Sequence, residues 1–456
     1  MRIFRPHLAV RRAGALALAA LIIVGAAAWA PALRSHHAPT TTTQLRVWYA
    51  TDDPDEGALA QALAKSFGAS HPSIHVALQT FGLDNLNQKM QLSLAGGTPP
   101  DVVYTTPRGP GLPAYVRAGK LRDLTGAARQ NHWAERLRPG LLADYNSLLT
   151  HGTRGSGHIY AAPYALAAVG VLYNKALFHR LHLSVPRTLS QMTTLLGRIQ
   201  RAGLTPLGLG NADGWVGDDW YLTMVNALTG PTALAPALRL DRHFSFGGAA
   251  FHTAASTLQS WSERNYFTRD FGGLDAQDSV DAFFEGRTAM QLVSSTEDPQ
   301  ILTLTRESKL DVGVFPFPSA SAGRPGVVPQ SGYAGWAIPT AARQPAAALA
   351  FIDAMTTDST ARALAAYGLL PASRVSVATL HPVASFQRDY LEILTTATPG
   401  VYLDAAPVPN LNATMEANVQ LLLQRVESPD FISHSLQEVY NSYGVKASST
   451  RTDGEF

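Results

Sequence analysis

The sequence predicts an α/β fold arranged as two lobes, and two observations lead to this prediction. The chain has 456 residues, more than one small core organises, so two lobes or domains are expected. Residues 45–104 alternate between strand-like and helix-like patterns, the rhythm of a mostly parallel sheet with helices on both faces. Hydrophobic residues make up 46% of the chain, so apolar side chains suffice to fill such cores.

The charge and cysteine content exclude several classes of protein. Residues 1–44 carry five arginines and no acid, which leaves 31 basic and 34 acidic residues in the rest of the chain. That body lacks the clustered Lys and Arg of a nucleic-acid-binding protein. The chain has no cysteine, which rules out disulfides, zinc–thiolate sites and a cysteine nucleophile.

The N-terminal segment predicts export. The first twelve residues contain four arginines, and residues 13–30 form an uncharged apolar run of 18 residues. This is the pattern of a signal peptide cleaved near residue 30, or of a retained membrane anchor, because the run is nearly long enough to span a bilayer. Residues 35–44 read as a tether. In both cases the body lies in the periplasm or on the extracytoplasmic face of the cytoplasmic membrane.

The body opens with the alternation on which the fold prediction depends. The patterns predict strands at 45–49, 74–78 and 101–104, separated by helices around 59–67 and 86–94. Acidic residues in the segment 52–56 suit the start of the first helix, since carboxylates there oppose the helix dipole. Gly96 and Gly97 end the second helix.

The later chain continues in the same style. Strands are expected at 170–173, 289–293 and 311–314. Helices are expected at 189–202, 249–264, 279–285, 344–356, 359–367 and 412–425. Trp133, Trp261 and Trp336 stand at core positions of this pattern.

A series of short motifs then resembles a known family. In order they are Trp48 in the opening strand, LAGGTPPDV at 94–102, GKLRDL at 119–124, IYAAP at 159–163 with LYNKALF at 172–178, FFEGRTAM at 283–290, GYAGWAI at 332–338 and LP at 370–371. Together they resemble family 1 of the extracellular solute-binding proteins of ABC importers, the maltose-binding-protein-like family, over residues 45–380. Each motif alone is weak, and their order carries the resemblance.

The resemblance implies a periplasmic-binding-protein-like fold with a ligand cleft between two α/β lobes joined by hinge crossovers. It divides the chain into 1–44 as signal or anchor with tether, 45–165 with 328–375 as lobe 1, and 166–327 with 376–456 as lobe 2. Crossings are expected near 163–168, 324–330 and 371–376. It further implies a monomeric binding protein without catalytic activity or cofactor. Such a protein captures a small polar ligand, here expected to be a mono- or oligosaccharide, and delivers it to the permease of an ABC importer.

Candidate ligand contacts are aromatic and polar residues at strand ends, because sugars offer C–H faces to aromatic rings and hydroxyls to polar groups. Asp52 and Asp53 follow the first strand. The resemblance puts Asp52 at a sugar-contact position, and capping of the next helix is the other interpretation. Thr105 and Arg108 stand where relatives carry an aromatic residue and an acid, so the ligand need not resemble maltose.

The remaining candidates come from three later segments. In the stretch 211–220, Trp215 could stack on a sugar ring with Asp218 or Asp219 on hydroxyls, and Trp220 could instead pack in the second lobe. Ser295 follows the strand at 289–293. Gly332 and Tyr333 stand where relatives approach the ligand through the backbone, and Arg374 could bind ligand or stay on the surface.

Three alternatives stay open at this point. An enzyme would need a nucleophile elbow, a P-loop, a zinc motif or a dinucleotide fingerprint, and the sequence has none of these. The paired carboxylates Asp218 and Asp219 could still serve a glycosidase. A membrane-anchored binding module for sensing fits the uncleaved N-terminal segment. A phosphorylated polyol or another non-sugar solute is the third alternative. No metal site is predicted, because Pro72 separates His71 from His75 and breaks the helix that would align them.

Overall fold

The computed structural model describes residues 42–452 except 52–53, 107–111, 150–156, 231, 239, 383, 404, 405, 407 and 409. Residues 1–41, which contain the predicted signal peptide or anchor, lie outside the described residues. No helix among the described residues has the length and apolar character that a bilayer span requires.

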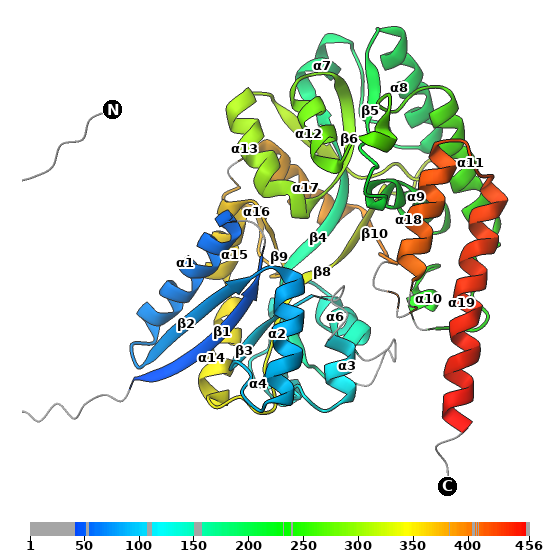
Figure 1. Ribbon diagram of the computed structural model, residues 1–456. Coiled ribbons are helices and arrows are strands. Elements are labelled where there is room, and N and C mark those ends of the chain that lie inside the picture. Colours follow the sequence, from blue (N-terminus) through cyan, green and yellow to red (C-terminus); the bar gives the residue numbers. More distant parts are fainter. Residues whose placement is uncertain are drawn as a thin grey trace, which may run out of the picture. The chain divides into compact units, whose positions relative to one another are not determined.

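The strands of the described residues form one mixed sheet (Figure 1). Their bounds are β1 Thr43–Ala50, β2 Ile74–Phe81, β3 Val102–Thr105, β4 Ala161–Asn174, β5 Thr205–Gly208, β6 Thr288–Ser294, β7 Val312–Phe315, β8 Val327–Ala337, β9 Leu370–Pro371 and β10 Thr398–Gly400. The main path runs β2-β1-β3-β8-β4-β6-β5. β1 pairs in parallel with β2 and β3, as the opening pattern predicts, whereas β4 and β8 are antiparallel to each other and to most of their neighbours.

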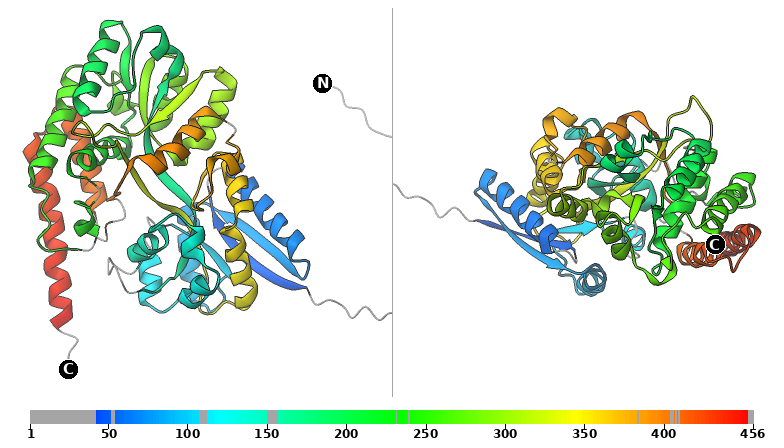
Figure 2. Two further views of the ribbon diagram at one scale, coloured as in Figure 1. Left: turned by 180° about the vertical axis from the view of Figure 1, so that it is seen from behind. Right: turned by 90° about the horizontal axis from the view of Figure 1, so that it is seen from above.

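Helices cover this sheet in two groups, which Figure 2 shows from behind and from above. The first group is α1 Pro54–Ser70, α2 Leu83–Ala95, α3 Leu112–Arg117, α4 Thr125–Gln130, α5 Trp133–Arg136, α6 Leu141–Leu149, α14 Pro345–Met355, α15 Asp358–Tyr367 and α16 Val377–Leu380. The second is α7 Lys175–Arg180, α8 Leu189–Arg201, α9 Trp215–Thr229, α10 Ala235–Leu238, α11 Ala249–Glu263, α12 Ala276–Phe284, α13 Asp298–Ser308, α17 Ser385–Thr396, α18 Leu411–Leu423 and α19 Pro429–Thr452, with short 3₁₀ turns η1 Phe271–Gly273 and η2 Ser295–Glu297.

Two long strands connect the two groups of elements. The first half of β4 pairs with β8, and its second half, from Val169, pairs with β6 and β7. Figure 1 shows β4 and β8 passing from one group to the other. The register of β4 against β8 shifts between Pro163 and Leu166, inside one predicted crossing. A bulge at that point bends the strand and increases its twist.

Two hydrophobic cores lie on this framework, which confirms the two-lobe α/β fold class. The first core is built around β1, β3, α1 and α14, and the second around α8, α9, α11 and α18. The first core continues into α12, α13 and α17, which the sequence assigns to the second lobe. The apolar packing is therefore continuous along β4, and the lobe boundaries at 165 and 328 remain a prediction.

Most of the predicted elements are present with slightly different ends. Trp133, Trp261 and Trp336 are fully or almost fully buried, as predicted. The sequence analysis missed β5, a four-residue strand that contains a proline. It also missed α6, where polar residues interrupt the apolar pattern.

Candidate functional site

The carboxyl ends of β1 and β3 meet at one edge of the sheet because these strands are parallel. Glu56, in the first turns of α1, is held there by two hydrogen bonds. Its Oε2 accepts from Thr51 Oγ1 at 2.7 Å, and its Oε1 accepts from the Tyr49 hydroxyl at 2.6 Å. The first helix thus presents a carboxylate fixed against the end of β1.

Three of the predicted contacts follow these two strands in the chain. Asp52, Asp53 and Arg108 lie outside the described residues. Thr105 is placed, and it is buried at the end of β3. Its position next to the strand end agrees with the expected location, while its hydroxyl is engaged by a tyrosine.

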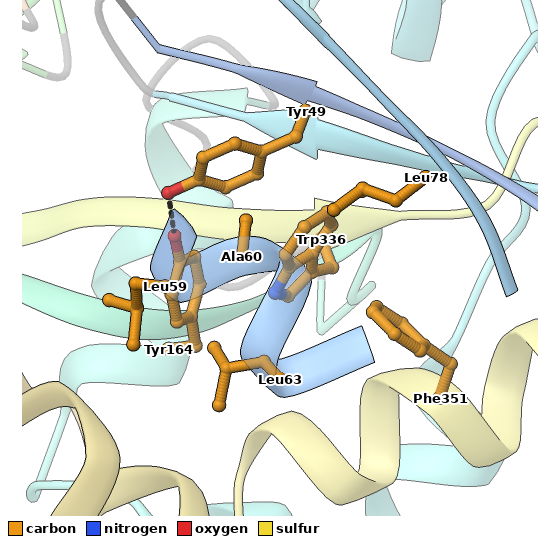
Figure 3. Close-up of a pocket in the computed structure, with 8 residues that line it drawn as sticks. All are labelled: Tyr49, Leu59, Ala60, Leu63, Leu78, Tyr164, Trp336 and Phe351. Carbon is orange, nitrogen blue, oxygen red and sulfur yellow. Dashed lines mark hydrogen bonds between the residues drawn. The ribbon is translucent and has the colours of Figure 1, made fainter. Parts of the chain in front are cut away.

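Four buried tyrosines surround this edge, and we call them the tyrosine cluster: Tyr49 on β1, Tyr104 on β3, Tyr145 on α6 and Tyr164 on β4. The hydroxyls of Tyr49 and Tyr164 are hydrogen-bonded at 2.6 Å (Figure 3). Tyr145 donates to the carbonyl of Thr105 at 2.9 Å, and its oxygen lies 2.8 Å from Thr105 Oγ1. Burial raises the pKa of all four phenols, so they stay neutral at physiological pH.

Trp336 packs behind the tyrosine cluster. Figure 3 shows its indole between Tyr164, the α1 side chains and Phe351 of α14. The ring centroids of Trp336 and Phe351 are 5.4 Å apart in an edge-to-face arrangement. The gap that these side chains leave has no room for a water molecule, so it is core packing and not a ligand pocket.

Tyr145 packs so closely against Gly332 that no side chain fits at this position. A Cβ at Gly332 would overlap Cδ2 of the Tyr145 ring, so only glycine lets α6 pack this closely on β8. Gly335 shows the same constraint, since its Cβ would lie 2.8 Å from the Tyr145 hydroxyl oxygen. Tyr333 is half-buried, and as the next residue of β8 it faces the side of the strand opposite to Gly332.

Ser295 joins the end of β6 to β4. Its Oγ accepts from the amide of Ala168 at 3.0 Å and lies 3.3 Å from the carbonyl of Leu166, to which it donates. These bonds fall where β4 leaves β8 and begins to pair with β6. The predicted contact Ser295 is thus fully buried and fixes the crossing strand.

Two acids follow Ser295, and we call Glu297 and Asp298 the acidic end of β6. Burial raises the pKa of Glu297 to about 7, although its Oε2 accepts from the amide of Ser294 at 3.0 Å. Burial, and then the neighbouring Glu297, raises the pKa of Asp298 well above its usual range. Among the described residues, neither carboxyl oxygen of Asp298 has a hydrogen-bond partner.

Trp215, Asp218 and Asp219 lie on α9, which packs against β6, β8 and β10. Asp218 is buried in the first turn, while Trp215 and Asp219 are half-buried. The preceding loop is tied to α18, because Gln420 Nε2 donates to the carbonyl of Asn211 at 2.6 Å. Trp220 is fully buried in the second core, as the packing interpretation of this residue expected.

The predicted contacts therefore fall into separate groups in the structure. Thr105, Gly332 and Ser295 all adjoin the crossing strands, whereas Trp215 and the two aspartates share the start of α9. Arg374 stands apart with an exposed side chain, and its amide donates to the carbonyl of Arg136 at 2.6 Å.

Sequence reasoning missed the groups that organise this region. Tyr49 reads as an ordinary strand residue, Tyr164 falls in the predicted crossing at 163–168 and in no predicted strand, and Tyr145 lies on a helix that the sequence analysis missed. Glu56 stood in an acidic run that was interpreted as helix start, which is where it lies. Within the described residues no cluster of His, Asp and Glu has the composition to hold a metal ion.

Comparison with known proteins identifies a family that this chain matches. Residues 50–362 match the family described as bacterial extracellular solute-binding protein. The multiple sugar-binding protein of Streptococcus mutans is 23% identical over 342 residues, which cover 73% of this chain and 76% of that protein. The melibiose/raffinose/stachyose-binding protein of Bacillus subtilis is 28% identical over 185 residues, 41% of this chain and 38% of that one.

Solved structures show the same fold. The apo form of RafE from Streptococcus pneumoniae superposes with a TM-score of 0.71 at 19% identity, covering 89% of this chain and 98% of that one. A chitin oligosaccharide binding protein gives a TM-score of 0.70 at 21% identity, covering 89% and 100%. RafE in complex with raffinose gives 0.68 at 19% identity, covering 88% and 99%.

Proposed function

This chain belongs to the family of bacterial extracellular solute-binding proteins, and on that premise we propose that it captures a mono- or oligosaccharide and delivers it to an ABC importer. The observation that carries the proposal is the pair of α/β cores joined by β4 and β8, with polar and aromatic residues gathered at the crossing. The family consists of binding proteins, and we propose that the chain catalyses no reaction.

Sugar is the proposed ligand class for two reasons. Similar proteins are named for sugar binding: multiple sugars, raffinose and chitin oligosaccharide. The chain also offers partly exposed aromatic rings at Tyr333 and Trp215, which suit the C–H faces of a sugar. Nearby carboxyl groups at Glu56 and Asp219 would accept hydrogen bonds from its hydroxyls.

The predicted contacts divide into two roles under this proposal. Trp215, Asp219, Tyr333 and Arg374 keep exposed surface and would touch the ligand directly. The buried side chains of Thr105, Asp218 and Ser295, together with Gly332, would fix the backbone that carries those contacts. Asp52, Asp53 and Arg108 stay proposed contacts from their positions after β1 and β3.

Closure of the two lobes is the proposed mechanism. β4 bends at its register shift, and the proposed hinges at 163–168, 324–330 and 371–376 lie on or beside β4, β8 and β9. A ligand that contacts both lobes binds the closed form more tightly than the open one, and only this difference shifts the population. The permease would then bind the closed form at the extracytoplasmic face of the membrane.

A thermal-shift screen of the full chain tests the sugar proposal. Raffinose, stachyose, chitin oligosaccharides and xylo-oligosaccharides are compared with glycerol phosphate and spermidine. A bound solute raises the apparent melting temperature by mass action. A shift with at least one sugar and none with the other solutes is expected, and a shift only with glycerol phosphate or spermidine would overturn the sugar assignment.

A Trp215→Ala variant then tests the site. The indole would cover a C–H face of the sugar, so its loss is expected to weaken sugar binding roughly tenfold. Phe431→Ala is the matched control, because Phe431 is an aromatic residue on α19 with 38% of its surface exposed. Equal affinity in both variants would remove Trp215 from the site.

Delivery to a transporter is tested separately. The full chain, expressed in its native membrane, is purified in the presence of the sugar that the screen identifies. Recovery of a permease and an ATPase subunit supports import. Recovery of a signalling protein in their place would favour a sensing module.

A further inference from the structure

A hollow lies away from the crossing strands, beside the short helices of the first group. It has a volume of about 460 Å³ and is formed by α4, α5, α6 and the segment before β4. We call it the α4–α6 pocket. Its volume falls in the range of small-molecule sites. α6 separates it from the tyrosine cluster, because Ala143 lines the pocket while Tyr145 faces Gly332 of β8.

The wall of this pocket combines apolar side chains with positive charge. Leu142 and Ile159 supply apolar surface, and Arg129 and Arg138 supply guanidinium groups. The single acid in the lining, Glu135, lies 3.2 Å from His132 and is largely exposed. Neither arginine forms an ion pair with a described residue.

Arg138 is the unusual member of the lining. Its side chain is largely buried, and its Nε is shielded from solvent without a hydrogen-bond partner among the described residues. Burial lowers the pKa of this guanidinium, which reflects the cost of a cation removed from water without a counter-charge. The neighbouring arginine Arg136 differs, since it pairs with Asp353.

The nearby acids are engaged elsewhere. Asp123 is held by Thr125 and by His158, whose Nδ1 lies 2.6 Å from Asp123 Oδ2. Asp144 lies beside Gly140 and is not among the residues that line the pocket. The pocket therefore presents uncompensated positive charge over an apolar floor.

We propose that the α4–α6 pocket binds a small organic anion, with its carboxylate on Arg138 and Arg129 and its apolar body against Leu142 and Ile159. A guanidinium fork matches the two oxygens of a carboxylate, and such charge-assisted hydrogen bonds are among the strongest in proteins. The bound anion supplies the counter-charge that Arg138 lacks. The site is separate from the proposed sugar site and does not depend on it.

Calorimetric titration of the full chain at constant ionic strength tests the proposal. The probes are benzoate, phenyl phosphate, inorganic phosphate and the neutral analogue benzyl alcohol. Benzoate is expected to bind with one-to-one stoichiometry and at least roughly tenfold more tightly than benzyl alcohol. Stronger binding of phenyl phosphate than of benzoate would assign the site to phosphate esters, and overturn the carboxylate assignment.

Matched variants locate the site. Arg138→Gln and Arg129→Gln are expected to weaken benzoate binding roughly tenfold or more, whereas Arg122→Gln, an exposed arginine outside the lining, leaves it unchanged. Ala143→Phe fills the pocket from an exposed helix position and is expected to block it even if Arg138→Gln folds poorly. Equal benzoate affinity in Arg129→Gln, Ala143→Phe and Arg122→Gln, or equal binding of benzoate and benzyl alcohol, would overturn the proposal.

Discussion

The tyrosine cluster and the acidic end of β6 both bury polar side chains beside β4, but they treat those groups differently. In the tyrosine cluster, the hydroxyls of Tyr49, Tyr145 and Tyr164 have hydrogen-bond partners. At the acidic end of β6, the carboxyl oxygens of Asp298 have none among the described residues. One fold therefore contains buried polar groups that keep their hydrogen bonds and buried polar groups that lack them.

The comparison shows how each region contributes to stability. A buried hydroxyl that keeps its hydrogen bonds costs little, and it specifies one packing arrangement. A buried carboxyl without partners stays in the fold by holding its proton, which is what the raised pKa of Asp298 expresses. The tyrosine cluster should thus resist changes of shape, while the acidic end of β6 should respond to pH.

The largest expected effect comes from filling space in the tyrosine cluster. Gly332→Ala places a methyl group against the Tyr145 ring, which is held by its bonds to Thr105. Overpacking of this kind costs about 3 kcal/mol of unfolding free energy. Denaturant unfolding measures it, with Gly126→Ala as a control in open space. A loss no larger than that of the control would show that Tyr145 moves freely.

The next effect is a pH dependence at the acidic end of β6. The pKa of Glu297 is about 7 in the folded protein against 4.5 in the reference state. Between these values the folded state binds more protons than the unfolded state, so this group's contribution to stability falls as pH rises from about 4.5 to about 7. Above that window the contribution stays at its lowest.

Glu297→Gln removes this titration and keeps an oxygen that accepts from the amide of Ser294. The free energy of unfolding of the variant minus that of wild type is expected to be about 2 kcal/mol larger at pH 8 than at pH 4. This figure includes a discount for the partial exposure of the side chain. Thermal unfolding across pH measures the difference. Glu285→Gln, an exposed acid at the end of α12, is the control and should show no such trend. A flat difference for Glu297→Gln would contradict the proton uptake.

A smaller effect is expected when one hydroxyl of the tyrosine cluster is removed. Tyr145→Phe leaves the carbonyl and the hydroxyl of Thr105 without this partner, at a cost of about 1–2 kcal/mol. Tyr160→Phe is the control, because Tyr160 is only partly buried and no hydrogen bond of its hydroxyl is recorded among the described residues. Equal stability of the two variants would mean that water replaces the lost bonds.

The same contrast explains how far the sequence predicted this molecule. Trp133, Trp261 and the strand at 45–49 follow from local apolar patterns, which report burial directly. The role of Gly332 does not follow in this way. The sequence analysis expects the backbone at Gly332 to approach a ligand closely. In the structure, the residue that approaches Gly332 closely is the ring of Tyr145 on α6, a helix some 190 residues earlier in the chain. No local pattern encodes such a distant contact.

The sequence placed several candidate residues at strand ends, but it did not predict which atoms their side chains bond to. Thr105 and Ser295 do stand at strand ends, as expected from the α/β pattern, but their hydroxyls bond to protein atoms. The hydrogen-bonded pair Tyr49 and Tyr164 joins residues 115 positions apart, so neither one signals the other in the sequence. Strand ends are local features, whereas hydrogen-bond partners are tertiary ones.

The smallest expected effect, Asp298→Asn, sharpens the comparison most. Burial raises the pKa of Asp298 well above its usual range and so favours the protonated carboxyl, and the amide replaces this neutral group by another of the same shape. Because no described residue bonds to its oxygens, no hydrogen bond is lost, and the change in unfolding free energy should stay below about 1 kcal/mol. Denaturant unfolding at pH 7 measures it beside Asp101→Asn, whose carboxylate accepts bonds from the amides of Arg46, Arg343 and Gln344 and should cost more. A loss for Asp298→Asn as large as that for Asp101→Asn would mean that Asp298 is ionised and bonded, and that the two regions bury their polar groups in the same way.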